Sequence, residues 1–224
     1  MALARQWCGH KVNKNIALDG WLNIDFPLMI FASTPHASLI KGMGILGIGQ
    51  KNYQKIPTLI NRESMDTESL ENSLKSSTTP MKIVVASCGT VNSGDFDNLK
   101  EISKICKKYN AWLHIDAAFG IFAKCSDQYK HLAKGLKHAD SITADAHKWL
   151  NVPYDCGILL TKHIKLLQET CGVSAPYLQE LDEIPNFSTL GIENSRRFRA
   201  LPVWMTLKVK MNNIYCYIFL LFFK

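Results

Sequence analysis

A lysine in an aromatic and apolar setting is the first residue of this sequence whose type and position suggest chemistry. Lys148 lies in the run 145–150 (Asp-Ala-His-Lys-Trp-Leu), directly after the strand-like stretch 141–144. A lysine in such surroundings can form an imine with a carbonyl group, because burial favours its neutral, nucleophilic amine. Structural lysines are commoner, so this spacing alone leaves both interpretations open.

A carboxylate at the end of another apolar stretch is the second candidate. Asp116 closes the stretch 111–116 and precedes the small residues Ala117 and Ala118. A carboxylate beside the ring nitrogen of pyridoxal 5′-phosphate (PLP) keeps that nitrogen protonated, so that the cofactor acts as an electron sink. The two alanines would let a flat ring approach closely. A helix cap or a structural hydrogen bond is the alternative role for Asp116.

Two more polar residues follow strand-like stretches. His36 comes after 28–33, and its imidazole is suited to stacking on the exposed face of a PLP ring. Thr90 comes after 81–87, and its hydroxyl is suited to contacting the phenolic oxygen of the same ring. Capping is the local alternative for His36, and turn formation is the alternative for Thr90.

Short apolar stretches alternate with helical patterns along the chain. We expect strands at 28–33, 81–87, 111–116, 141–144 and 157–161. We expect helices at 36–46, 66–74, 99–109 and 129–137. Such alternation predicts βαβ units and a mainly parallel sheet covered by helices. Ligands bind beyond the carboxyl ends of the strands in these sheets, and the candidate residues all lie at such ends.

The glycines at 42, 44 and 47 match the Gly-x-Gly-x-x-Gly fingerprint of dinucleotide-binding proteins, and Glu63 lies about where a ribose-binding acid would. The fingerprint requires the glycines to follow a strand and open a helix. These glycines lie in and after the helical pattern that begins near His36. We therefore interpret them as a site of close packing and a helix exit, with nucleotide binding as an alternative that a titration with NAD tests.

Three runs in this order resemble the group II PLP-dependent amino-acid decarboxylases, which act on glutamate, aromatic amino acids or cysteine sulfinate. They are 86–97 (Ala-Ser-Cys-Gly-Thr-Val-Asn-Ser-Gly-Asp-Phe-Asp), 114–120 (His-Ile-Asp-Ala-Ala-Phe-Gly) and 139–149, which ends in His-Lys-Trp. The runs 19–21 and 196–201 also resemble family segments. The resemblance covers residues 1–208.

The resemblance implies the α/β fold of type I PLP enzymes, which is aspartate-aminotransferase-like, and a homodimer. It also implies a role for each of six residues. Lys148 carries the Schiff base, His147 contacts the phosphate, Asp116 pairs with the pyridinium, Ala118 packs on the ring, His36 stacks on it and Thr90 lies near its phenolic oxygen. Of these, Lys148, Asp116 and His36 are the expected catalytic residues, and no metal is implied.

The implied activity is decarboxylation of an amino acid by a carboxy-lyase. Transamination or cleavage of a carbon–carbon bond is the alternative, because the same lysine and aspartate serve all these reactions. An inactive, truncated product is the other alternative. The family's phosphate-binding loop would precede Met1, so we expect 1–208 to be an incomplete large domain and 209–224 to be a non-native or remnant apolar tail.

The composition narrows the expected partners and location. The 26 basic residues outnumber the 19 acidic ones, but no basic block interleaved with aromatics predicts nucleic-acid binding. The seven cysteines are widely spaced and include no Cys-x-x-Cys, and the first residues lack a signal-peptide pattern, which together favour the cytoplasm. The apolar run 214–223 is shorter than the roughly 20 residues that span a bilayer, so we expect no membrane partner.

Overall fold

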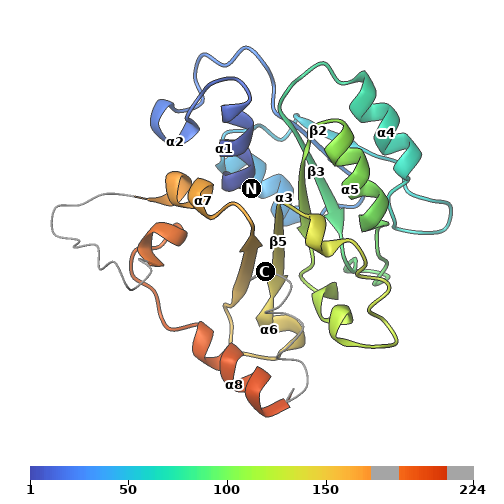
Figure 1. Cartoon of the computed structure of the whole chain (residues 1–224), viewed down its shortest axis with the longest axis vertical. Coiled ribbons are helices and arrows are strands. Elements are labelled where there is room, and N and C mark those ends of the chain that lie inside the picture. The colour runs from blue at the N-terminus through green and yellow to red at the C-terminus, as the bar shows by residue number, and fades with distance from the viewer. Residues whose placement is uncertain (173–186, 211–224) are drawn as a thin grey trace.

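A single sheet organises the computed structural model, which describes residues 1–172 and 187–210 (Figure 1). Its six described strands are β1 (Met29–Ala32), β2 (Tyr53–Lys55), β3 (Lys82–Ser87), β4 (Trp112–Asp116), β5 (Ser141–Asp145) and β6 (Gly157–Thr161). They lie in the order β2-β1-β3-β4-β5-β6. All neighbouring strands are parallel except β5 and β6, which are antiparallel. The prediction of a mainly parallel sheet is therefore confirmed.

The central strands β3 and β4 are buried on both faces. Ile83 and Trp112 pack in the core on one side of the sheet, whereas Val84 and Leu113 pack in the core on the other side. This division follows from the strand itself, because successive side chains point to opposite faces. Parallel strands that are covered on both faces consist of continuous apolar stretches, and such stretches predict both β3 and β4 in this sequence.

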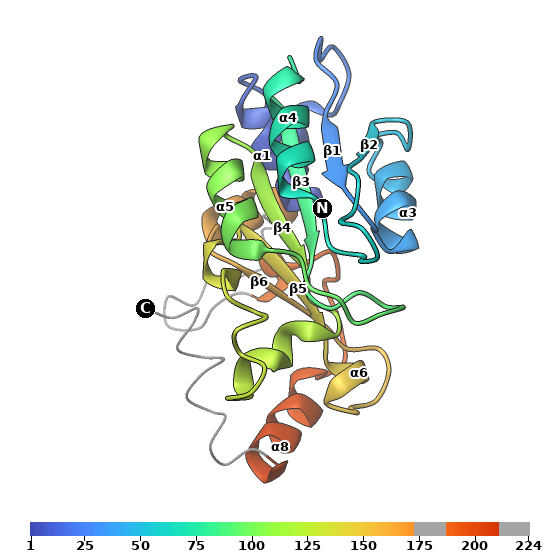
Figure 2. The ribbon, with the colours of Figure 1, turned by 90° about the vertical axis from the view of Figure 1, so that its right-hand side faces the viewer.

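Helices cover both faces of the sheet (Figure 1 and Figure 2). On one side the core includes residues of α1 (Ala2–His10), α3 (Ala37–Ile45) and α7 (Ile164–Cys171). On the other side it includes residues of α4 (Thr67–Ser76) and α5 (Leu99–Lys108). The remaining described helices are α2 (Ile16–Asp19), α6 (Ala146–Trp149), α8 (Ala200–Lys210) and the 3₁₀ helices η1 (Gly120–Cys125), η2 (Leu136–His138) and η3 (Phe187–Leu190).

Helix α5 illustrates how the sequence specifies a covering helix. Its apolar residues Leu99, Ile102 and Ile105 are buried, as their near-helical spacing predicts. The side chain of Asn98 accepts a hydrogen bond from the Glu101 N–H at 3.2 Å and so caps the first turn. The prediction of a helix at 99–109 is therefore confirmed, and the helix ends at Lys108.

The predicted helix at 129–137 is wrong, because this segment forms turns that end in η2. Gly135 adopts φ of +117°, a conformation outside any right-handed helix. A Cβ at this glycine would lie 2.6 Å from the Lys100 backbone nitrogen, so the turn packs directly on the start of α5.

The predicted boundary after residue 208 falls inside α8. The apolar tail at 211–224 lies outside the described residues, so that division of the chain stays a prediction.

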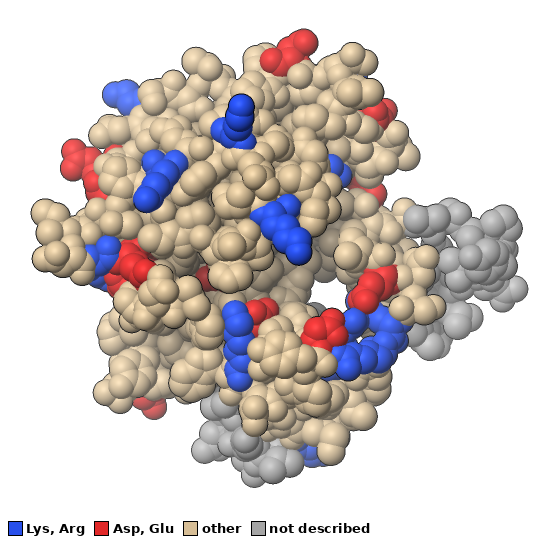
Figure 3. Space-filling view, turned by 180° about the vertical axis from the view of Figure 1, so that it is seen from behind, with Lys and Arg blue, Asp and Glu red and all other residues tan. Residues whose placement is uncertain are grey.

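Charged side chains are dispersed over the face of the molecule that Figure 3 shows. Basic side chains lie there singly or next to acidic ones. In the basic run near the carboxyl end, for example, Arg199 pairs with Glu193 at 2.8 Å and with Asp155 at 3.1 Å. Within the described part of the chain, no helix is both long enough and apolar enough to cross a membrane.

Candidate active site

The carboxyl ends of β1, β3, β4 and β5 meet at one edge of the sheet and border a cavity of about 550 Å³. This volume lies within the range of about 300–1,000 Å³ that is typical of small-molecule sites. Five of the six predicted site residues line the cavity: His36, Thr90, Asp116, Ala118 and Lys148. A larger hollow of about 1100 Å³, beside the start of α5, contains none of the six, so volume alone does not identify the site.

Lys148 lies in α6, the short helix that follows β5 directly. Its Nζ is 2.9 Å from Oδ2 of Asp145, the last residue of β5, and 4.0 Å from the centre of the Phe119 ring. The carboxylate and the aromatic face both attract the ammonium and hold it at the cavity wall. Asp145 was not predicted as a site residue, although its spacing of three residues from Lys148 across a strand-to-helix junction is a usable signal.

Asp116 ends β4, with Ser87 of β3 and Thr143 of β5 beside it in register. Its Oδ1 accepts a hydrogen bond from the Ala118 N–H at 3.1 Å. Asp116 therefore makes the structural hydrogen bond that the sequence left open as its alternative role. Its Oδ2 accepts no hydrogen bond from any residue that the structure describes. The carboxylate therefore stabilises the local turn and keeps one oxygen available to a ligand in the cavity.

Thr90 contacts a second carboxylate, which belongs to Glu63. The Thr90 hydroxyl donates to Glu63 Oε2 and accepts the Asp95 N–H at 3.0 Å. Its proton is therefore directed at Glu63, and a contact with a cofactor's phenolic oxygen stays a prediction. Glu63 itself lines the cavity, whereas the sequence had suggested it only as a partner of the glycines at 42–47.

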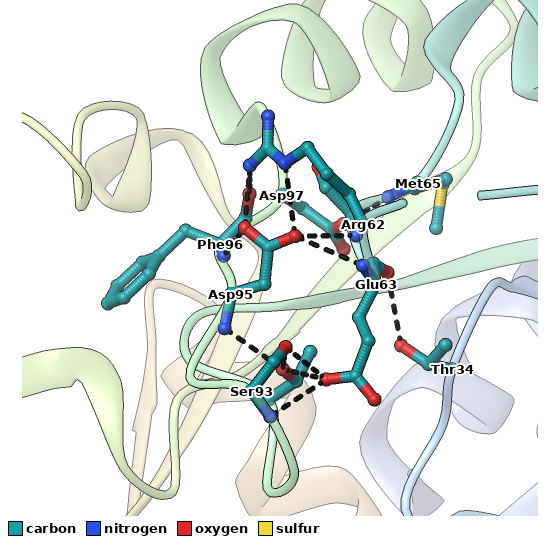
Figure 4. A network of polar contacts seen from close by, with 10 residues as sticks. Thr34, Arg62, Glu63, Met65, Ser93, Asp95, Phe96 and Asp97 are labelled. Carbon is teal, nitrogen blue, oxygen red and sulfur yellow. Dashed lines mark hydrogen bonds and ion pairs between the residues drawn. The ribbon is translucent and has the colours of Figure 1, made fainter. Parts of the chain in front are cut away.

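The described donors that hold the Glu63 carboxylate are all uncharged, and Figure 4 shows the contacts from Ser93. Its Oε2 accepts hydrogen bonds from Thr90 and from the backbone N–H and hydroxyl of Ser93, at 3.2 and 2.6 Å, and its Oε1 accepts one from Asn92 at 2.9 Å. The side-chain hydrogen bonds from Ser93, Thr90 and Asn92 lower the pKa of the Glu63 carboxyl to about 2. Glu63 is therefore ionised at neutral pH.

The depressed pKa of Glu63 predicts a change in acid stability. A group whose pKa is lower in the folded state stabilises the protein above its ordinary pKa of 4.5, and that contribution is lost as the pH falls towards 2. We expect Glu63→Gln to lose less stability than the wild type between pH 5 and pH 2 in urea-unfolding series. Equal losses of stability in the two proteins would contradict the claim that these hydrogen bonds lower the pKa of Glu63 in the folded state.

Two further aspartates join the loop that carries Glu63 to the loop after β3. Asp95 pairs with Arg62 at 2.6 Å and accepts the Ser64 N–H at 3.0 Å. Asp97 is buried and accepts the N–H groups of Met65 and Ser87 at 2.6 and 2.7 Å. Burial raises the pKa of Asp97, and its two hydrogen bonds act in the opposite direction. These contacts position the Glu63 side of the cavity.

Replacing Asp97 by Asn is expected to destabilise the fold by about 1–3 kcal/mol, because one of two buried N–H donors would then face an amide NH₂ and lose its acceptor. Urea unfolding of the full chain measures this change. Asp127→Asn is the matched control, since the Asp127 side chain is 99% exposed, and its effect should stay under about 0.5 kcal/mol. Equal effects of the two variants would contradict a structural role for Asp97.

The two predicted histidines lie in different surroundings. His36 is exposed, lines the cavity and caps α3, accepting the Ser38 N–H at 3.3 Å through Nδ1. His147 is not among the lining residues; its Nδ1 accepts the Cys156 N–H at 3.0 Å, and its ring lies 4.3 Å from that of Tyr154. Both local roles are structural, and the predicted stacking of His36 and phosphate contact of His147 stay predictions.

The glycines of the dinucleotide fingerprint do not open a helix after a strand. Gly42 and Gly44 lie inside α3, and Gly47 follows it with φ of +69°, which marks the exit of the helix. This placement agrees with our interpretation of these residues as packing and helix-exit positions.

Known proteins match this chain over most of its length. The model of the pyridoxal-dependent decarboxylase conserved domain matches residues 11–215. An aromatic-L-amino-acid decarboxylase of Bacillus atrophaeus is 33% identical over 195 residues, which cover 84% of this chain and 40% of the relative. An L-2,4-diaminobutyrate decarboxylase of Acinetobacter baumannii is 31% identical over 232 residues, which cover 95% of this chain and 44% of the relative.

Solved structures give the same result for the fold. The crystal structure of mouse CSAD superimposes with a TM-score of 0.82 at 27% identity, covering 92% of this chain and 44% of that one. The chain thus spans about two fifths of the length of these relatives, and its fold is that of the large domain of type I PLP enzymes, as its sequence motifs imply. This chain belongs to the pyridoxal-dependent decarboxylase family.

Proposed function

We propose that the protein binds PLP in the 550 Å³ cavity through Lys148 and serves the decarboxylation of an amino acid. One observation carries this proposal: the amine of Lys148 and the carboxylate of Asp116 line the same cavity, at the ends of the neighbouring strands β5 and β4. Family membership supports the reaction class, because the family model and the two relatives described above are named as decarboxylases.

The chemistry of the cavity fits the cofactor. Lys148 offers a primary amine for an aldehyde, and Asp116 Oδ2, which accepts no hydrogen bond from a described residue, offers a negative charge for a protonated ring nitrogen. Ala118 adds a small side chain to the cavity lining, and His36 adds an imidazole. When bound, PLP supplies an electron sink for the electron pair that remains when a bond to the substrate's Cα breaks.

The chain's own residues position the reacting nitrogen. Asp145 Oδ2, 2.9 Å from Lys148 Nζ, holds this nitrogen at the cavity wall, where it would meet the aldehyde. The Phe119 ring limits the access of water to the same nitrogen from one side. Asp116 holds its negative charge at the strand end through the Ala118 N–H and so stabilises positive charge beside it.

The test begins with the full chain and PLP. Reduction with borohydride should leave a pyridoxyl group on Lys148, which peptide mass spectrometry locates. With candidate amino acids, release of CO₂ without formation of a keto acid supports decarboxylation. Formation of a keto acid favours transamination, and the absence of a pyridoxyl group on Lys148 would contradict the proposal.

We also infer the partners and the location of the protein. The described cysteines are free thiols, which suits a reducing compartment such as the cytoplasm.

Large apolar side chains near the carboxyl end are exposed, including Phe187, Ile192 and Phe198. Exposed apolar surface of this kind marks interaction sites, which supports a second copy of the chain as a partner. Sedimentation of the chain distinguishes a dimer from a monomer.

A further inference from the structure

The ionisable groups of the proposed active-site cavity are unequal in charge. Its described lining contains three carboxylates, Glu63, Asp116 and Asp145, and one ammonium, that of Lys148. His36 is the remaining titratable group. Asp145 is paired with Lys148 at 2.9 Å, and the proposed function assigns Asp116 to the ring nitrogen of PLP. Glu63 is then the carboxylate without a compensating charge.

The surroundings of Glu63 do not neutralise it. Its hydrogen-bond donors Thr90, Asn92 and Ser93 are all uncharged. The adjacent cation in the chain, Arg62, is bound to Asp95 through two hydrogen bonds at 3.1 and 2.6 Å, and Figure 4 shows these two side chains turned towards each other. The phosphate group of a bound cofactor would add negative charge to the cavity. An anionic ligand side chain is therefore disfavoured there.

Glu63 also keeps the capacity to bind a ligand. From the residues that the structure describes, its Oε2 accepts three hydrogen bonds, but its Oε1 accepts only one, from Asn92. A carboxylate oxygen has two acceptor sites, so Oε1 can accept one more hydrogen bond. Because Glu63 is bound to Thr90, which follows β3, it lies on the opposite side of β4 from Lys148, which follows β5. The reacting amine and Glu63 thus border different parts of the cavity.

We propose that Glu63 is a specificity-determining residue, whose carboxylate favours an amino-acid substrate with a positively charged side chain and disfavours one with an acidic side chain. This inference rests on the proposed function, since it assumes that the amino acid reacts at the Lys148 side of the cavity. The hydrogen bonds from Thr90, Asn92 and Ser93 hold the charge in place before a ligand arrives, so little reorganisation is needed on binding.

The experiment measures how readily an amino acid displaces Lys148 from the cofactor. The full chain is loaded with PLP, equilibrated with an amino acid and reduced with borohydride, and the pyridoxyl group that remains on Lys148 is quantified. Two pairs of probes differ mainly in charge: L-arginine with L-citrulline, and L-glutamate with L-glutamine. For the wild type we expect half-displacement by arginine at about a tenfold lower concentration than by citrulline, the size of one charge-assisted hydrogen bond. Glutamate should require more than glutamine.

The variant Glu63→Gln should remove both differences. The Gln oxygen can accept the hydrogen bonds of Thr90 and Ser93, and its NH₂ can donate to a reoriented Asn92 amide, so the loop contacts are retained. Glu68→Gln is the matched control, because Glu68 is exposed in the first turn of α4 and does not line the cavity. This control should keep both differences.

The possible outcomes separate the two proposals. A wild type that does not distinguish arginine from citrulline would overturn the role of Glu63, whether or not the variant folds. The same holds if Glu63→Gln keeps the wild-type preference. If the wild type acquires no pyridoxyl group on Lys148 before any amino acid is added, the proposed function itself fails, and the inference about Glu63 fails with it.

Discussion

Replacing Lys148 by alanine should abolish the pyridoxyl adduct that borohydride traps on the wild-type chain. Lys148 supplies the only amine among the described residues that line the cavity, so no other lysine there can replace it. The expected result is a complete loss of label from the peptide that contains residue 148. It should be accompanied by loss of the absorbance band of the covalently bound cofactor. This is the largest effect that the structure predicts.

The substitution is suited to the test because the fold does not depend on this side chain. Lys148 is 26% exposed, and alanine is the best helix former for its place in α6. Lys104→Ala is the control, since Lys104 is exposed on α5 and its ion-pair partner among the described residues is Glu101 of the same helix. The control should keep the label. A label that persists in Lys148→Ala, or that is found on a different lysine of the wild type, would show that the imine lysine has been assigned incorrectly.

The parts of the fold that the sequence predicts are those whose burial comes from local pattern. Strands β3 and β4 are recognisable because both of their faces are covered and their residues are apolar throughout. Strand β2 was not predicted, because its three residues are only partly buried or exposed, and their strand conformation depends on pairing with β1. The false helix at 129–137 has a similar origin: the contact of Gly135 with α5 joins distant parts of the chain.

The residues of the candidate site also divide into those that a local pattern predicts and those that depend on contacts between distant parts of the chain. Asp116, Thr90 and Lys148 were predicted because each follows a strand of a parallel sheet, where topology brings the side chains together. Glu63 lies in a loop between β2 and α4, and hydrogen bonds with residues distant in the chain hold this loop at the cavity, such as that from the Glu63 N–H to Asp95 at 3.1 Å. A sequence pattern carries no signal for such a contact.

His147 shows the limit of reasoning from adjacency. It is next to Lys148 in the chain, yet consecutive side chains on a helix point in directions about 100° apart. The structure places Lys148 in the cavity lining and His147 against Cys156 and Tyr154. Both side chains approach Asp145 Oδ2, Lys148 Nζ at 2.9 Å and His147 Nε2 at 3.7 Å, but only Lys148 of the two lines the cavity. The role of each residue therefore needs its own test.

Replacing Asp116 by asparagine should weaken PLP binding about 10- to 100-fold, which is the range expected when a hydrogen bond loses its charged partner. The change removes the negative charge and alters the shape of the side chain very little. Asparagine can still accept the Ala118 N–H and form the same local turn, so the strand end should be preserved. Titration of the full chain with PLP, followed by absorbance, measures the change in affinity.

The pattern of effects distinguishes a carboxylate that faces the cofactor from one that only closes a turn. If Asp116 holds the ring nitrogen, Asp116→Asn lowers the affinity but still allows saturating PLP to label Lys148, because the covalent link is made at the other end of the cavity. If Asp116 only closes the turn, Asp116→Asn should leave both the PLP affinity and the unfolding midpoint of the cofactor-free chain nearly unchanged, because asparagine keeps the hydrogen bond from the Ala118 N–H. Asp127→Asn provides the control for the loss of a negative charge outside the cavity. Unchanged PLP affinity in a stable Asp116→Asn protein would remove the carboxylate from the proposed site and leave Lys148 without the partner that makes the cavity suited to this cofactor.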